Sequence, residues 1–144
     1  MSKSLEQTVK FKAPPRAVFE ALMDAKQHAR FTGAPARISR KPGGAFSVHG
    51  GYATGYLLDL VADKRIVQAW RASDWPRGAY SIVTFALAPA PGKQTVLTFS
   101  HDGVPDIEAA GIKQGWTDFY WRPLKMMLEG ASGGDAAGRR RRRR

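Results

Sequence analysis

The sequence predicts one α+β domain in which a curved antiparallel β-sheet of about six to seven strands wraps around a long C-terminal helix. The middle of the chain is a series of short β-branched and aromatic segments, and the connections between them are too short for crossover helices. Only one later segment is long and apolar enough to cover such a sheet. The 144 residues, 43% of them hydrophobic, are enough for one such domain and leave no room for a second.

The first part of the chain is expected to form a strand and two short helices. Apolar and polar residues alternate over 5–11, which is typical of a strand with one buried face. Pro14 and Pro15 suit the start of a helix, because the amides of a first helical turn have no intrahelical partner. This helix is expected to end near Asp24, and a second to cover 25–31 before the turn at 32–35.

Five later segments are predicted strands, joined by turns rich in glycine and proline. They cover residues 45–49, 52–60, 65–71, 79–88 and 95–101. Residues two apart lie on the same face of a strand, and three of these segments carry an apolar row of this kind. The rows are Tyr56, Leu58 and Leu60; Val83, Phe85 and Leu87; and Leu97, Phe99 and His101. Each row needs an apolar cover, which the final helix can supply.

The final helix is expected to begin after Gly103-Val104-Pro105 and to run to about Leu128. Asp106 can serve as its N-cap, and Glu108 complements the helix dipole. Apolar residues lie around much of its circumference, which indicates a buried or nearly buried helix. Ile112, Trp116, Phe119, Tyr120 and Met127 share one side, and Trp121, Leu124 and Leu128 an adjoining one. Pro123 removes one backbone hydrogen bond inside this helix, so we expect a kink that bends it along the curved sheet.

The net charge of +11 comes largely from six consecutive arginines, Arg139 to Arg144. Without them 17 basic residues (23 minus 6) stand against 12 acidic ones, so the remainder carries +5. These charges are scattered, and the domain shows no nucleic-acid footprint. We expect a domain over 1–129 and a glycine-rich linker with the arginine tail over 130–144. The tail is either native, with non-specific binding to polyanions, or an added tag.

Some classes of site and location are excluded by what the sequence lacks. It contains no cysteine, which excludes disulfides and thiolate metal sites. The N-terminus has no apolar secretory segment, and no apolar run reaches the roughly 20 residues of a membrane span. We therefore expect a soluble cytoplasmic protein.

The three histidines do not form a recognisable catalytic or metal motif. His28 is expected on a surface helix and His49 beside a glycine turn, and no two histidines have the spacing of a helical metal site. Ser100-His101-Asp102 is not a catalytic triad, because neighbouring side chains of a strand point to opposite faces. We expect neither a metal nor a cofactor.

Short stretches spread over 5–128 occur in an order typical of a known group of proteins. They include Ala13-Pro14, Phe31-Thr32-Gly33, Gly43-Gly44-Ala45-Phe46, Gly50-Gly51, Ile66 to Arg71, Thr95 to His101, Gly103-Val104-Pro105 and Gly115-Trp116. In this order they resemble the START-like superfamily, and within it the family related to activators of the Hsp90 chaperone ATPase. The resemblance implies the helix-grip fold, with a β-α-α-β-β-β-β-β-β-α element order and a cavity between the sheet and the final helix. It does not imply one activity, since related proteins include co-chaperone domains, hydrophobic-ligand binders and enzymes.

The expected cavity would be walled by apolar and aromatic side chains from the sheet and the final helix. The candidate lining residues are Phe46, Tyr56, Leu58, Trp70, Val83, Phe85, Leu97, Phe99, His101, Trp116, Phe119, Tyr120 and Met127. The alternative is that these residues fill an ordinary core. His101 is expected either to be half-buried and hydrogen-bonded to a neighbour or to act as a polar anchor in the cavity.

Three functions are consistent with the sequence. The first is a non-catalytic carrier or sensor of a small hydrophobic molecule, bound by apolar burial. The second is a chaperone-linked interaction module, in which the outer sheet face or loops contact a protein and the cavity is only core. The third is a cavity enzyme of cyclase or hydrolase type with His101 or a tyrosine as acid or base. No orienting partner for such a group is recognisable, so an enzyme is the least favoured of the three.

Overall fold

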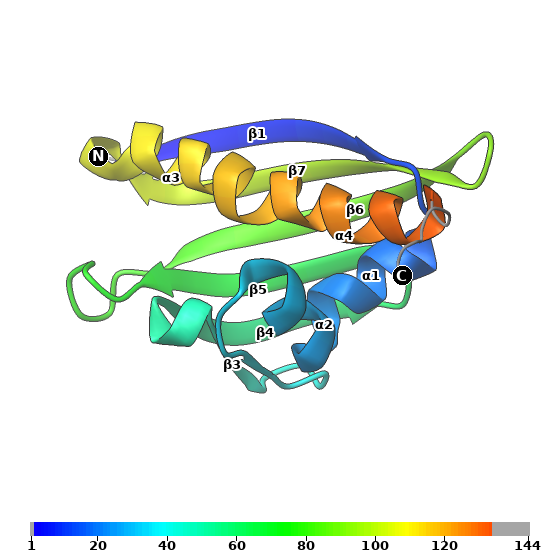
Figure 1. The fold of residues 1–144 in the computed structure, drawn as a ribbon. Coiled ribbons are helices and arrows are strands. Elements are labelled where there is room, and N and C mark those ends of the chain that lie inside the picture. Colours follow the sequence, from blue (N-terminus) through cyan, green and yellow to red (C-terminus); the bar gives the residue numbers. More distant parts are fainter. Residues whose placement is uncertain (1, 134–144) are drawn as a thin grey trace.

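The computed structural model of this protein describes residues 2–133. Its strands form one antiparallel sheet of seven strands in the order β1-β7-β6-β5-β4-β3-β2 (Figure 1). They are β1 (Ser2–Phe11), β2 (Arg37–Ile38), β3 (Ala45–Val48), β4 (Ala53–Val61), β5 (Arg65–Ala72), β6 (Ser81–Ala90) and β7 (Gln94–Pro105). Strands β2 to β7 form a meander, as their short connections predicted, and β1 pairs with β7. The predicted α+β helix-grip fold is confirmed.

Helices cover one face of the sheet. Between β1 and β2 lie α1 (Pro15–Met23) and α2 (Ala25–Thr32). The final helix consists of α3 (Ala109–Trp116), a π-helical turn η3 (Thr117–Trp121) and α4 (Arg122–Gly133). It runs along the sheet in Figure 1, with α1 and α2 beside its C-terminal half. Two 3₁₀ turns, η1 (His49–Gly51) and η2 (Asp106–Glu108), precede β4 and α3.

The final helix differs from its prediction at both ends. Asp106 begins the 3₁₀ turn η2, and no side chain caps this turn or α3, so the expected N-cap at Asp106 was wrong. The helix also continues to Gly133, past the expected end near Leu128. The first residues of the predicted linker are therefore helical. The arginine tail lies outside the residues that the structure describes.

Immediately before Pro123, where a kink was expected, the helix contains the π-helical turn η3. The N–H of Arg122 bonds to the carbonyl of Thr117, which is the spacing of a π-helix. Pro123 follows this turn as the second residue of α4, and its missing N–H removes one hydrogen bond from the continuous helix. Gln7 of β1 holds both ends of the turn, because its side-chain amide donates to Thr117 Oγ1 at 3.2 Å and accepts from Trp121 Nε1 at 2.9 Å.

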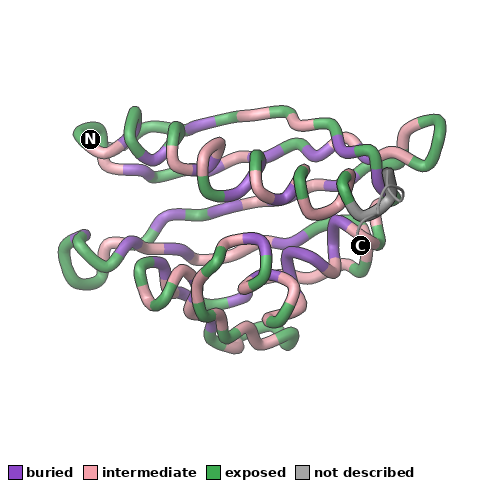
Figure 2. Tube along the Cα trace, in the orientation of Figure 1, coloured by how far each residue is buried: buried purple, intermediate pink, exposed green. Residues whose placement is uncertain are grey.

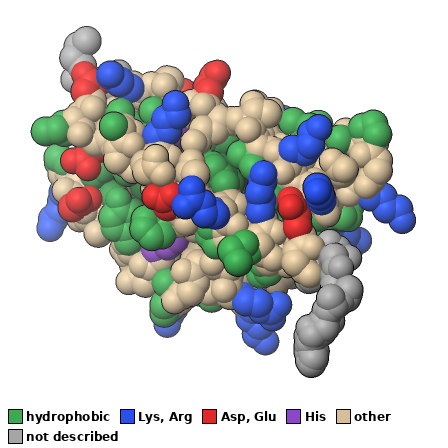
Figure 3. All heavy atoms as spheres, turned by 45° about the horizontal axis from the view of Figure 1, so that its top comes forward, with side chains coloured by type: hydrophobic (Ala, Val, Ile, Leu, Met, Phe, Trp, Pro, Cys, Tyr) green, Lys and Arg blue, Asp and Glu red, His purple; other side chains and the backbone are tan. Residues whose placement is uncertain are grey.

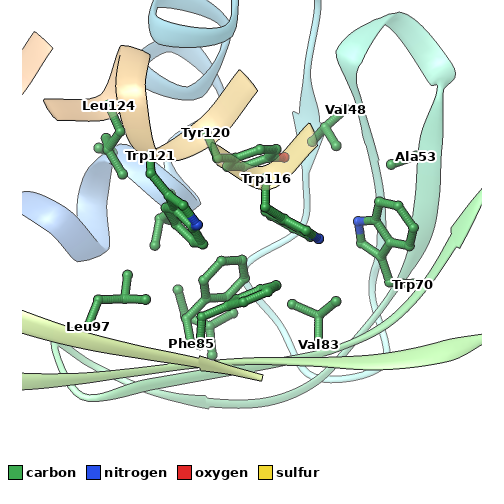
Figure 4. Packing of buried hydrophobic residues seen from close by; sticks show 14 of the residues in the cluster. Val48, Ala53, Trp70, Val83, Phe85, Leu97, Trp116, Tyr120, Trp121 and Leu124 are labelled. Carbon is green, nitrogen blue, oxygen red and sulfur yellow. The ribbon is translucent and has the colours of Figure 1, made fainter. Parts of the chain in front are cut away.

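Most of the space between the sheet and the final helix is filled with side chains. The facing residues in Figure 4 are Trp116, Tyr120, Trp121 and Leu124 from the helix and Val83, Phe85 and Leu97 from the sheet. The ring centroids of Phe99 and Trp116 are 4.5 Å apart. Buried positions alternate along β6 and β7, as Figure 2 shows for the strands. The apolar rows predicted on these two strands therefore face the helix and form the core.

On β4 two residues of the predicted apolar row, Tyr56 and Leu58, face away from the helix, whereas Leu60, beyond a register shift between Leu57 and Asp59, packs partly against the core. Tyr56 is 47% and Leu58 48% exposed on the outer face, whereas Gly55 and Leu57 are buried. A Cβ at Gly55 would collide with the carbonyl oxygen of Ala69, so this position holds no side chain. Because the inner row includes a glycine, the outer row looked the more apolar of the two in the sequence. The expected placement of Tyr56 and Leu58 in a cavity was wrong.

Candidate functional site

A surface pocket of about 320 Å³ opens between the first part of the final helix, the turn η1 and strand β5. It is lined by His49, Tyr52, Trp70, Gly111, Ile112, Gly115, Trp116, Phe119 and Tyr120. These residues come from η1, the position between η1 and β4, the end of β5, and α3 with η3. On the face drawn in Figure 3, hydrophobic side chains gather around a histidine at the surface. The pocket lies beside the packed core and not inside it.

One wall of the pocket is bare helix backbone. Gly111 and Gly115 lie one turn apart on α3, at the spacing that places residues on one helix face. A Cβ added at Gly111 would meet no atom within 4 Å, and one at Gly115 would meet only the Phe119 ring at 3.8 Å. The absence of side chains at these two positions therefore leaves this wall of the pocket open.

Aromatic rings form the other walls. The Trp70 ring is edge-on to Tyr52, with centroids 6.4 Å apart, and tilted against Trp116 at 5.8 Å. Tyr52 is 43% and Phe119 61% exposed, so both belong to the mouth of the pocket. Phe119 was expected on the covered side of the helix. It remains at the surface because the π-helical turn buries the two residues that follow it.

Next to the pocket, Tyr120 is hydrogen-bonded to a buried histidine. Tyr120 Oη and His28 Nε2 are 2.9 Å apart, and His28 is 3% exposed. Burial disfavours the charged imidazole and lowers the pKa of His28 to about 3, while burial raises the pKa of the Tyr120 hydroxyl. Both side chains are therefore neutral at pH 7. His28 was expected on a surface, but it lies three residues before the buried Phe31 on the same side of α2.

His49 brings an imidazole to the pocket from a left-handed turn. Its φ is 52°, and the φ of Gly50 and Gly51 are 64° and 98°. Non-glycine residues seldom adopt this region, and such strain is often found at functional sites. The His49 ring lies 5.0 Å from the Tyr120 ring, and burial lowers the pKa of His49. Within residues 2–133 its ring nitrogens have no hydrogen-bond partner.

His101 lies behind Trp70 and Trp116, and both of its ring nitrogens are occupied. Ser81 Oγ donates to the Trp70 carbonyl at 2.7 Å, so His101 Nε2 is the donor in its own 2.7 Å contact with Ser81 Oγ. Its Nδ1 accepts from Trp116 Nε1 at 3.1 Å. This arrangement requires a neutral ring, and burial lowers the pKa of His101 to about 4. His101 is hydrogen-bonded to its neighbours, as one of the two expectations had it, but it is fully buried instead of half-buried, and it does not line the pocket as a cavity anchor would.

The outer face of the sheet carries a separate group of exposed apolar side chains, which we call the outer patch: Tyr56, Leu58, Tyr80 and Ile82. Tyr56 pairs with Ala69 on β5, which pairs with Ile82 on β6, so these residues lie side by side across three strands. The rings of Tyr56 and Tyr80 have centroids 6.2 Å apart. The outer patch is the second surface of the described chain that could hold a partner.

No group of three or more His, Cys, Asp or Glu residues within 2–133 is placed to hold a metal ion. In the same part of the chain, no helix has both the length and the apolar character needed to cross a membrane.

The family model described as Activator of Hsp90 ATPase homolog 1-like protein matches residues 12–129. This chain belongs to that family. An uncharacterized protein of Schizosaccharomyces pombe is 34% identical over 124 residues, and the human Activator of 90 kDa heat shock protein ATPase homolog 1 is 30% identical over 115 residues. These matches cover 86% and 80% of this chain but 37% and 34% of the relatives, so the chain spans about a third of their length.

Solved structures of activator-like proteins have the same fold. The crystal structure of an HSP90 activator from Plasmodium falciparum matches with a TM-score of 0.82 at 28% identity, over 88% of this chain and 96% of that one. The Aha1 dimer from Colwellia psychrerythraea matches with a TM-score of 0.74 at 19% identity, over the same shares of the two chains, and supports the fold alone. The family that the sequence resembled is therefore confirmed.

In this family member the predicted cavity residues fall into separate places. Trp70, Trp116, Phe119 and Tyr120 line the pocket; Phe46, Val83, Phe85, Leu97, Phe99 and His101 are buried in the core; Met127 is partly buried against the core; and Tyr56 and Leu58 belong to the outer patch. Ligand binding by any of them remains a prediction. Three of the four predicted residues that line the pocket come from the final helix.

Five lining residues of the pocket were missed from the sequence: His49, Tyr52, Gly111, Ile112 and Gly115. Two signals could have found them. One is the pair of glycines four residues apart in a helix that is otherwise strongly apolar, since glycine weakens a helix interior. The other is a histidine next to two glycines, a sequence that favours left-handed backbone.

Proposed function

We propose that this protein binds a small, uncharged apolar molecule in the pocket and acts as a non-catalytic carrier or sensor. The observation that carries the proposal is the open volume of about 320 Å³ beside an otherwise filled core. Most of its wall is apolar or aromatic, so burial of apolar surface, at ~25 cal/mol per Å², would hold the ligand.

The state of His101 favours binding over catalysis. A general acid or base must reach the proton that it moves. His101 is fully buried, its pKa is lowered by burial, and both ring nitrogens are engaged with Ser81 and Trp116. The residue on which the enzyme interpretation depended is therefore a core residue.

Binding is tested with N-phenyl-1-naphthylamine, an uncharged dye that fluoresces in apolar sites. The wild-type protein is expected to enhance its fluorescence in a saturable way. Gly115→Leu is expected to lose most of this signal, because the new side chain enters the open volume. Ala110→Leu is the matched control, since Ala110 is exposed on the same helix and does not line the pocket.

Native mass spectrometry of protein purified from its own host then identifies what the pocket retains. The expected result is a co-purifying small molecule in the wild type that is absent from Gly115→Leu. If no dye binds in a saturable way and no molecule is retained, the proposal is rejected.

A second candidate is a chaperone-linked interaction, which the comparisons favour. The human relative and the Plasmodium protein are both named as activators of a heat-shock ATPase or of HSP90. The outer patch presents exposed tyrosines, a residue type enriched at protein interfaces. In this role the outer patch would contact the chaperone.

The second candidate is tested by the ATPase rate of a purified Hsp90 with and without this protein. The rate is expected to rise, and the double variant Tyr56→Ser, Tyr80→Ser is expected to stimulate it less. Met126→Ser is the control, because Met126 is 74% exposed on α4, outside the outer patch. An unchanged ATPase rate with the wild-type protein would reject this candidate.

A further inference from the structure

We infer that the ligand of the pocket is a flat, uncharged aromatic molecule with one hydroxyl group, which bonds to the imidazole of His49. This inference rests on the proposed function and names the class of molecule that the same site selects. Three independent features of the pocket carry it: a flat wall, the absence of charge from the lining, and a half-buried imidazole without a hydrogen-bond partner.

The flat wall is formed by Gly111 and Gly115. Glycine in a helix interior costs about 1 kcal/mol relative to alanine. Packing does not require it here, since a Cβ at Gly111 would meet nothing within 4 Å and one at Gly115 would only touch the Phe119 ring. The contrast is Gly55, where a Cβ would collide with backbone. Two helix glycines that only keep space open favour an occupant that lies against the backbone, as a planar ring system does.

The lining residues carry no Asp, Glu, Lys or Arg. The histidines that contribute to this region, His49 at the pocket and His28 next to Tyr120, both have a pKa lowered by burial and are neutral at pH 7. Burial, and then the charges of Asp74 and Glu108, raise the pKa of Tyr52 at the mouth, but neither carboxylate belongs to the lining. A charged ligand inside the pocket would therefore lose hydration without direct contact with an opposite charge, which is costly. The pocket therefore selects an uncharged molecule.

The imidazole of His49 supplies the hydrogen bond. Its ring nitrogens have no partner within residues 2–133, whereas the hydroxyl of Tyr120 is already bonded to His28. A half-buried polar group gains free energy when it acquires a hydrogen-bond partner. A neutral imidazole has one N–H and one bare nitrogen, and a hydroxyl can bond to either. The ring contacts of His49 with Tyr120 and Phe119, at 5.0 and 6.2 Å between centroids, place it at the aromatic end of the pocket.

Three probes test the inference: 1-naphthol, naphthalene, and 1-naphthoate. Their dissociation constants are measured by quenching of tryptophan fluorescence, since Trp70 and Trp116 line the pocket. The wild type is expected to bind 1-naphthol about tenfold more tightly than naphthalene, the ratio that one net hydrogen bond of about 1.4 kcal/mol produces. Binding of 1-naphthoate is expected to be weaker than that of both.

The variant His49→Gly removes the imidazole and keeps a residue that accepts the left-handed backbone. It is expected to bind both neutral probes more weakly and to lose the preference for 1-naphthol, so that the ratio of the two constants falls to about one. The ratio is the readout, because the loss of apolar contact affects both probes alike.

The results distinguish a failure of the inferred ligand class from a failure of the proposed function. A 1-naphthol preference that persists in His49→Gly, or 1-naphthoate binding as tight as that of 1-naphthol, overturns the ligand class while the pocket still binds. Binding that is unchanged in Gly115→Leu overturns the inference by placing the probes elsewhere. If none of the three probes and no N-phenyl-1-naphthylamine binds, the proposed function fails and the inference fails with it.

Discussion

Lowering the pH from 7 to 5 is expected to destabilise this protein through two buried histidines. The folded chain holds His28 with a pKa of about 3 and His101 with a pKa of about 4, against a usual value of 6.5. The unfolded chain therefore takes up a proton at each site that the folded chain does not, so the free energy of unfolding falls as the pH falls below 6.5. The loss ends near the pKa of each histidine in the folded chain.

The size of the effect follows from the two pKa values. A histidine with a pKa of about 4 when folded and 6.5 when unfolded lowers the free energy of unfolding by about 2 kcal/mol at pH 5, and His28 contributes about as much. The sum of about 4 kcal/mol is a large part of the roughly 5–15 kcal/mol that stabilises a typical domain. Histidines are the side chains that ordinarily titrate in this pH range.

Urea unfolding followed by tryptophan fluorescence at several pH values measures this loss. The variant His101→Gln is the diagnostic control, because it removes one titrating group whatever it costs in stability. The slope of the free energy of unfolding against pH is expected to fall by up to about 1.4 kcal/mol per pH unit in this variant. Stability that does not change between pH 7 and pH 5, or a slope that is the same in the variant, would refute the assignment of a neutral buried His101.

Three further substitutions test the packing. Gly111→Ala is expected to raise the free energy of unfolding by about 1 kcal/mol, because the added Cβ meets no atom; a lower urea midpoint would contradict this. Gly55→Ala is expected to lower it by about 3 kcal/mol or more, because its Cβ would collide with the carbonyl of Ala69; a normal yield and midpoint would show that the strands can separate there. Thr95→Val removes the 2.7 Å hydrogen bond that the buried Thr95 Oγ1 donates to the Ala13 carbonyl, and is expected to cost about 1–3 kcal/mol. A midpoint equal to that of the wild type would mean that this carbonyl finds another partner.

The sheet could be predicted from the sequence because alternation and short turns determine it locally. The apolar rows on β6 and β7 were predicted on the correct face, since the positions that face the helix there carry large side chains that are visible as a pattern in the sequence. On β4 the inward row contains Gly55, which has no side chain and so leaves no apolar signal. The exposed Tyr56 and Leu58 then dominated the pattern.

The pocket could not be predicted to the same degree, because it depends on how distant segments meet. His49, Trp70 and Gly111 are far apart in the chain, and only the sheet order brings η1, β5 and α3 together. The open volume also results from missing side chains, which leave no hydrophobic pattern to detect. The burial of His28 follows from its contact with Tyr120, an interaction across the fold that helical spacing on α2 alone does not show.

The π-helical turn η3 determines which way the glycine wall of the pocket faces, although most residues of this turn do not line the pocket. Trp121 at its end and Leu124 after it are buried against the sheet, while Gly111 and Gly115 before it face the pocket. Deleting one residue from this turn would rotate α3 by about 100° about its axis relative to α4. The glycine wall would then no longer face Trp70, although no lining residue had been replaced. Homologues that keep the lining residues but differ in the length of this turn are therefore expected to present a different pocket.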